Sequence, residues 1–181
     1  MISGEANDQL CTTHFEVLGV LGVDSKGVRQ YRRSELETDE ADNLEDCSDV
    51  ISIVSFRIES GKKHQIRAHA SQVLGCPILN DTKYGFTGKW QSKNLQKLMD
   101  GFPDRFLKVV EEETSKMEPD LKGVLVSNYK GSLDENGWIG LHSYRLQFKF
   151  GGENIEVKSR LSLQIRTVLK MLGGREEWIY N

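Results

Sequence analysis

The feature that most constrains the fold of this chain is a run of acidic residues in its first third. Residues 35–49 hold eight Asp and Glu side chains and no Lys or Arg. Because eight like charges repel one another and resist burial, we expect a flexible acidic loop, bounded as residues 34–49. The segments on either side, residues 12–22 and 50–59, are rich in β-branched and aromatic residues, and each is predicted to be a strand. The chain therefore begins with two strands joined by an acidic loop.

The remaining patterns alternate between helix and strand. A helix is predicted after the turn at Ser60-Gly61, anchored by apolar residues at helical spacing: Ile66, Ala70, Val73 and Leu74. Further helices are expected over residues 89–116, broken at 101–103, and over 160–172. Strands are expected at 123–129 and 138–150, and Gly151-Gly152 is expected to turn the chain into a hairpin strand at 154–157. These elements predict an α+β fold with a largely antiparallel mixed sheet and packed helices, in a single domain spanning residues 1–181.

Composition excludes several classes of protein. Hydrophobic residues make up 38% of the chain and the mean hydropathy is −0.48, which is typical of a soluble globular protein. There is no apolar run of the roughly 18–20 residues that a membrane span needs, and the N-terminal residues do not resemble a signal peptide. Cys11, Cys47 and Cys76 are widely spaced, which indicates reduced thiols in an intracellular protein. His64 and His69 have no Cys or carboxylate at ligand spacing, so no metal site is expected.

Positive charge is concentrated in the segment that follows the second predicted strand. The whole chain carries a formal charge of −3, yet without the acidic run 19 acids face 24 bases. Residues 57–97 alone hold eight Lys and Arg against two acids. Four polar residues, Lys62 to Gln65, crowd the start of the predicted helix, and His64 and Arg67 share one helical face because they are three residues apart. This pattern fits either a phosphate or RNA site or an ordinary basic amphipathic helix.

The same segment closely resembles the RluA-type pseudouridine synthase family. Three motifs in order carry the resemblance: Ser60-Gly61-Lys62-Lys63-His64-Gln65-Ile66-Arg67-Ala68-His69, then Gly75-Cys76-Pro77-Ile78, then Asn80-Asp81-Thr82-Lys83-Tyr84-Gly85. Leu141-His142-Ser143 resembles a late strand of the family, so the match covers about residues 10–150. Lys62, Asn80 and Cys76 stand where the family has Arg, Gly and His. The resemblance implies the C-terminal half of the pseudouridine synthase catalytic domain.

That resemblance also implies a chemistry and a set of site residues. The family needs no cofactor: a uridine in RNA is flipped out of its stack, its glycosidic bond is cut, and the base is rejoined through carbon. Arg67 is implied as the catalytic residue that pairs with the nucleophilic aspartate and keeps it ionised. The implied RNA-binding residues, which would contact a ribosomal or transfer RNA, are Lys62, Lys63, His64, Gln65, His69, Lys83 and Tyr84.

The family's Arg-Leu-Asp motif, which carries the nucleophile, does not occur in these 181 residues. The nearest imitation, Ser132-Leu133-Asp134, is expected to be a turn. We therefore expect the C-terminal portion of an RNA pseudouridine synthase, inactive alone, whose partner is the missing N-terminal half of the same enzyme. The alternative is a non-catalytic RNA-binding or ribosome-assembly protein built on the same half-fold. Arg67 is expected in an open cleft near an acid or an anion, and Arg67→Ala is expected to leave the stability of this chain almost unchanged or to raise it.

Overall fold

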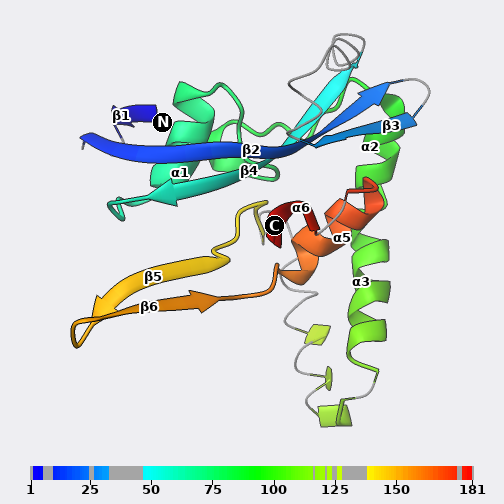
Figure 1. The fold of residues 1–181 in the computed structure, drawn as a ribbon. Helices are drawn as coiled ribbons and strands as arrows, with labels where there is room; N and C mark the ends of the chain where they lie inside the picture. Colours follow the sequence, from blue (N-terminus) through cyan, green and yellow to red (C-terminus); the bar gives the residue numbers. More distant parts are fainter. Residues whose placement is uncertain are drawn as a thin grey trace.

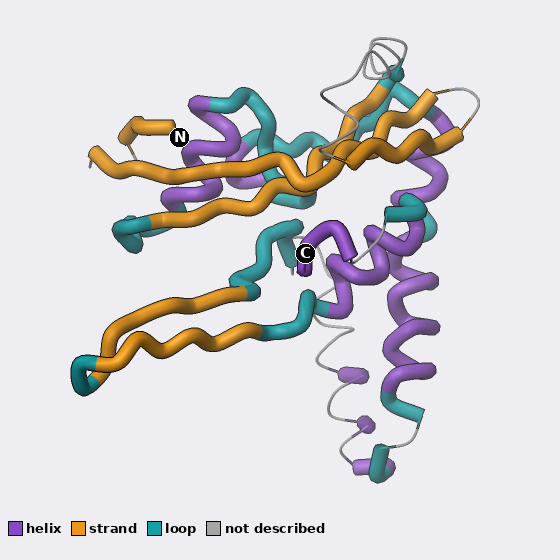
Figure 2. Tube along the Cα trace, in the orientation of Figure 1, coloured by secondary structure: helices purple, strands orange, loops and turns teal. Residues whose placement is uncertain are grey.

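The fold was analysed in a computed structural model of the chain. The structure describes residues 2–5, 10–24, 27–32, 47–115, 117–120, 122–123, 126–127, 138–174 and 177–180. Two antiparallel sheets and a group of helices make up these parts (Figures 1 and 2). The larger sheet forms one layer with α1 beside it, and the hairpin β5–β6 lies apart from that sheet. α2, α3 and α5 gather at one end (Figure 1). None of the described helices has the length and apolar character needed to cross a membrane.

The larger sheet is built around one long strand, β2 (Leu10–Asp24). β4 (Asp49–Ile58) pairs with it along one edge. On the other edge, β1 (Ile2–Glu5) pairs with its first part and β3 (Gly27–Arg32) with its last part. The β2–β4 register shifts between Val17 and Gly19, which marks a β-bulge and a local increase in twist. The two predicted strands are thus confirmed as antiparallel neighbours, whereas β1 and β3 were not predicted.

Of the acidic stretch, the structure describes only the last residues, 47–49. Residues 33–46 lie outside the described residues, so the expected flexible loop stays a prediction there. Both the backbone N–H and the hydroxyl of Ser48 donate to the carbonyl of Val23, at 2.9 and 3.0 Å. Asp49 is the first residue of β4, and its carboxylate accepts hydrogen bonds from the backbone N–H groups of Gln91 and Ser92, at 3.0 and 2.6 Å. The expected loop therefore ends before Asp49, which joins β4 to the start of α2.

The helices follow the predicted pattern with sharper boundaries. The first predicted helix is a single turn, α1 (Gln65–Ala68), continued by a π-helical turn, η3 (His69–Val73). The next predicted helix is divided at Gly101 into α2 (Lys93–Asp100) and α3 (Phe102–Glu113), and Pro103 lies in the first turn of α3, where proline is tolerated. α5 (Leu163–Met171) begins after Ser162, whose hydroxyl accepts the N–H of Ile165 at 3.4 Å. A short α6 (Glu177–Tyr180) follows.

Two strand predictions need correction. In the span 123–129, the described residues Gly123, Val126 and Ser127 have helical rather than extended backbone. A short apolar run is compatible with either state, and Val126 satisfies its burial by packing against the helical core. In the span 138–150, the strand begins only at β5 (Arg145–Phe150). The hairpin itself is confirmed: β6 (Glu153–Lys158) pairs antiparallel with β5 across the Gly151-Gly152 turn, where both glycines have positive φ, 59° and 89°.

The main core lies where the last part of β2 meets the helices. Leu21 and Val23 pack with side chains from α2, α3 and α5, and these residues are nearly inaccessible to solvent: Leu95, Phe102, Phe106, Val110, Val168 and Leu172. α1 and η3 instead contact the first part of β2, together with β1. The helical part of the motif segment is therefore held by β2 apart from the main core, whereas Leu79 in the same segment packs against that core.

Candidate functional site

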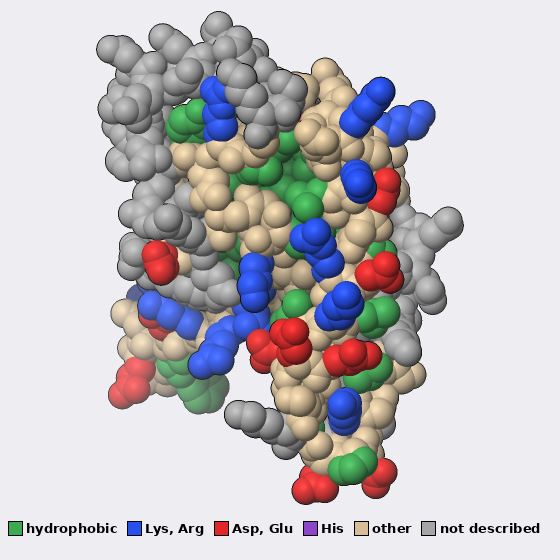
Figure 3. Space-filling view, turned by 90° about the vertical axis from the view of Figure 1, so that its right-hand side faces the viewer, with side chains coloured by type: hydrophobic (Ala, Val, Ile, Leu, Met, Phe, Trp, Pro, Cys, Tyr) green, Lys and Arg blue, Asp and Glu red, His purple; other side chains and the backbone are tan. Residues whose placement is uncertain are grey.

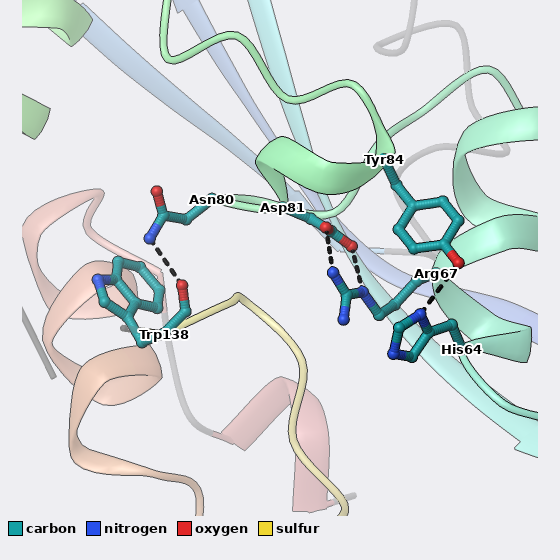
Figure 4. A network of polar contacts seen from close by, with 6 residues as sticks. All are labelled: His64, Arg67, Asn80, Asp81, Tyr84 and Trp138. Carbon is teal, nitrogen blue, oxygen red and sulfur yellow. Dashed lines mark hydrogen bonds and ion pairs between the residues drawn. The ribbon is translucent and has the colours of Figure 1, made fainter. Parts of the chain in front are cut away.

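The centre of the motif is an ion pair between Arg67 and Asp81. Arg67 donates from Nε to Oδ2 of Asp81 at 2.7 Å and from Nη2 to Oδ1 at 2.6 Å, so one edge of the guanidinium faces both carboxylate oxygens (Figure 4). The Asp81 side chain has no exposed surface, whereas 19% of the Arg67 side chain is exposed. Arg67 thus lies beside an acid, as expected from the sequence, but it is half-buried and the acid is one of the motif's own residues.

Tyr84 and His64 continue this arrangement toward the surface. The Arg67 guanidinium carbon lies 5.0 Å from the centre of the Tyr84 ring, a cation–π distance. The Tyr84 hydroxyl shares a hydrogen bond of 3.1 Å with Nδ1 of His64, and the two rings meet edge to face. The backbone of His64 has φ +58°, a left-handed conformation that is uncommon for a residue other than glycine. Such strain persists only where neighbouring contacts hold it, and it is enriched at functional sites.

The charges around His64 are positive. Burial, followed by the charges of Arg67, Lys83 and Lys63, lowers the pKa of the His64 imidazole, and Asp81 opposes this only in part. Lys62, Lys63 and Lys83 are all exposed. By contrast, the side of the molecule formed by α2 and α3 carries Lys and Arg interspersed with Asp and Glu (Figure 3). An anion is therefore favoured near His64 by the side chains that surround it.

Gln65 and His69, two of the expected RNA-binding residues, point into the protein instead. Their exposures are 2% and 0%, and both reach the hydroxyl of Thr13 on β2. Gln65 Nε2 donates to that hydroxyl at 3.0 Å and to the carbonyl of Thr12 at 2.8 Å. Nδ1 of His69 lies 2.8 Å from the Thr13 hydroxyl, and its Nε2 lies 3.7 Å from Sγ of Cys11. This burial removes both residues from the set that RNA could touch in this structure.

The helical anchoring expected from the sequence also differs. Val73, expected to be buried, is 45% exposed and is the last residue of the π turn. The polar residues Gln65 and His69, four apart, provide the anchor together with the small Ala68 and Ala70. Thr13 was not predicted as part of the site. The available signal was that a buried Gln and His require polar partners, and the preceding strand offered Thr12-Thr13.

The loop that carries Asp81 is fixed from the other side by the segment before β5. Asn80, with φ +63°, donates from Nδ2 to the carbonyl of Trp138 at 2.7 Å (Figure 4). Gly140 donates its N–H to the carbonyl of Leu79 at 2.7 Å. A side chain at residue 140 would place its Cβ 2.9 Å from Cβ of Leu79, which explains the glycine. The described residues contain no group of three His, Cys, Asp or Glu arranged to hold a metal ion.

The chain aligns with several RNA pseudouridine synthases over short stretches. It is 53% identical over 34 residues to the 21S rRNA pseudouridine(2819) synthase of Saccharomyces cerevisiae, covering 19% of this chain and 13% of the yeast protein. It is 42% identical over 48 residues to an RNA pseudouridine synthase of Zymomonas mobilis, covering 26% and 20%. It is 46% identical over 46 residues to the chloroplastic RNA pseudouridine synthase 2 of Arabidopsis thaliana, covering 25% and 10%.

These alignments cover only 10 to 20% of the length of the three relatives. No family model matches the chain. No solved structure matches it either. Over these stretches the chain is similar to RNA pseudouridine synthases.

Proposed function

We propose that this chain is the C-terminal portion of an RNA pseudouridine synthase and provides the part of the active site that contains Arg67. The observation that carries this proposal is the guanidinium of Arg67, bound to Asp81 along one edge and partly exposed, inside a group of basic side chains. In the family chemistry an arginine at this place pairs with the nucleophilic aspartate and keeps it ionised. The aspartate would come from the missing N-terminal half, with which this partial domain would form the complete site.

RNA is the proposed substrate, a ribosomal or transfer RNA in a folded state. Exposed Lys62, Lys63 and Lys83 would contact phosphates, since ammonium groups neutralise the backbone without reading its sequence. His64 and Tyr84 lie beside Arg67 and would contact the flipped nucleotide or its phosphate. The contacting set is therefore smaller than the sequence indicated, because Gln65 and His69 are buried.

The experiment that tests this surface reverses two of its charges. The double variant Lys62→Glu with Lys63→Glu is expected to bind structured RNA more weakly and to show a flatter salt dependence. Each lost phosphate contact removes about 0.9 from the slope of log affinity against log salt for duplex DNA, and about 0.7 for single strands. The measurement is fluorescence anisotropy of a labelled RNA hairpin at several salt concentrations.

The matched control is Lys93→Glu with Lys97→Glu, which makes the same charge change on α2. Because α2 lies on the face where both signs of charge are interspersed, this variant is expected to retain most of the affinity (Figure 3). Equal losses in both double variants would show that only the overall charge matters and would contradict the proposed surface.

A further inference from the structure

The Arg67 guanidinium can bind an oxyanion along two edges, and among the described residues only one of these edges is bound. Nε and Nη2 are bound to Asp81. Nη1 makes no hydrogen bond among the described residues, and it is not sealed from solvent. Figure 4 shows the third guanidinium nitrogen pointing away from the Asp81 carboxylate. A planar guanidinium whose Nε edge is fixed has its remaining N–H groups fixed in direction as well.

Asp81 is itself held more firmly than an ordinary surface carboxylate. Its side chain has no exposed surface, and its backbone carbonyl accepts the N–H groups of Tyr84 at 3.0 Å and Phe86 at 3.1 Å. Its own N–H donates to the carbonyl of Ile78 at 3.0 Å. Because Asn80 is tied to Trp138, the loop is fixed on both sides of Asp81. The carboxylate is thus part of a rigid support and cannot turn outward to react.

We propose that Asp81 is the positioning residue for Arg67: it takes the Nε edge so that the Nη1 edge faces outward as a preformed receptor for one oxyanion, a carboxylate or a phosphate. Tyr84 completes the support, since its ring covers the guanidinium face at 5.0 Å. The inference rests on the proposed function only for the identity of the anion, whereas the orientation of Arg67 is a property of this chain.

The test uses the chain labelled with ¹⁵N-arginine and follows the guanidinium by NMR. In the unsubstituted chain we expect an Nε–H signal that is protected from solvent exchange and is assigned to Arg67 through its loss in Arg67→Lys. Titration with inorganic phosphate should shift the Nη signals of Arg67 and leave this Nε–H signal in place. Displacement of the Nε–H signal by phosphate would overturn the inference, because the anion would then compete with Asp81 for the same edge.

The variant Asp81→Asn removes the charge and keeps the side-chain shape. We expect Nε–H exchange at least tenfold faster and phosphate binding at least fivefold weaker, although the cluster has gained net positive charge. A purely electrostatic role of Asp81 would not give this result, because a more positive site would bind phosphate more tightly. Asp49→Asn is the matched control, since the Asp49 carboxylate also accepts two hydrogen bonds, but from the backbone just before α2. In this variant the Nε–H exchange of Arg67 and the phosphate affinity should both be unchanged. Unchanged or tighter phosphate binding in Asp81→Asn would overturn the inference.

A uridine oligonucleotide separates this inference from the proposed function. If the oligonucleotide does not bind while the Nε–H signal still depends on Asp81, the RNA function fails and the positioning role stands. If the oligonucleotide binds equally well to the unsubstituted chain and to Asp81→Asn, the proposed function stands and the positioning role fails. The unsubstituted chain alone gives the phosphate titration, so the test remains decisive even if Asp81→Asn folds poorly.

Discussion

The carboxylate of Asp81 depends on Arg67 for its charge compensation. Arg67→Ala would leave this fully buried carboxylate without a cation. Breaking a buried pair by removing one partner typically costs about 3–5 kcal/mol. Because Arg67 is 19% exposed and water could partly replace it, we expect a loss of about 3 kcal/mol in the free energy of unfolding. This replaces the sequence-based expectation of almost no change, which treated the missing aspartate as the only partner. The measurement is urea unfolding followed by tryptophan fluorescence.

Lys83→Ala is the control for that measurement, since Lys83 is exposed in the same loop and should change the stability by less than about 0.5 kcal/mol. An Arg67→Ala variant as stable as the parent would show that Asp81 finds another partner or that solvent reaches it.

The pKa of His64 predicts proton-linked RNA binding. Burial and the charges of Arg67, Lys83 and Lys63 lower this pKa in the free chain, while Asp81 raises it slightly and Tyr84 shares a hydrogen bond with the ring. A bound phosphate favours the imidazolium and raises the pKa, so the complex takes up a proton, and RNA affinity rises as pH falls through the pKa of the complex toward the lowered pKa of the free chain. His64→Asn, which tolerates the left-handed backbone, should remove this dependence. Anisotropy titrations at each pH measure it, and identical slopes in parent and variant would contradict it.

At the scale of elements, the anchoring of α1 and η3 depends on one hydroxyl. The Thr13 hydroxyl accepts from Gln65, and no acceptor other than Nδ1 of His69 is described for its own hydrogen. This places the imidazole proton on Nε2, facing Cys11. Thr13→Val keeps the shape but leaves two buried polar groups without their partner, at a cost of about 1–3 kcal/mol each. We expect the melting temperature to fall by several degrees.

Thr12→Val is the matched control. It is the same substitution at the neighbouring residue, whose side chain points to the other face of β2. Its backbone carbonyl, which accepts from Gln65, is retained. Equal effects of the two variants would show that β-strand propensity, and not the Thr13 hydroxyl, determines the result.

The elements that could be predicted from the sequence are those with a strong period or a clear boundary residue. β2, β4, the division at Gly101 and the β5–β6 turn fall into this group. β3 was missed because its six residues, which lie between the first predicted strand and the acidic run, were assigned to no element. The π turn was missed because the spacing of apolar residues does not distinguish a turn with an i→i+5 hydrogen bond from one with an i→i+4 hydrogen bond.

At the scale of the whole molecule, the proposed catalytic site lacks a nucleophile within these 181 residues. The 181 residues contain no Arg-Leu-Asp, and the acid beside Arg67 is fully buried. We therefore expect no release of tritium from RNA that carries tritium at C5 of uridine. A complete RNA pseudouridine synthase acting on the same RNA serves as the positive control. Release above background by the isolated chain would require a nucleophile elsewhere in these residues.

A sequence motif gives the order of the residues in the site but not the directions of their side chains. The order of Arg67, Asp81 and Tyr84 was visible in the sequence, and so was the need for an acid near Arg67. The direction in which each side chain points was not visible, because it depends on contacts with distant residues: Thr13 for His69 and Gln65, and Trp138 for the loop of Asp81. Family resemblance therefore found the residues but did not separate those that are exposed from those that hold the fold.

The π turn η3 has an evolutionary consequence. The N–H of Leu74 bonds to the carbonyl of His69, five residues back, so this turn holds one residue more than an α-helical turn. Loss of one residue between 70 and 73 would convert it to an ordinary turn without costing a backbone hydrogen bond. Gln65, Arg67 and His69 precede the change and would keep their positions. Single-residue length differences among relatives are thus expected to accumulate here, where they leave the arginine undisturbed.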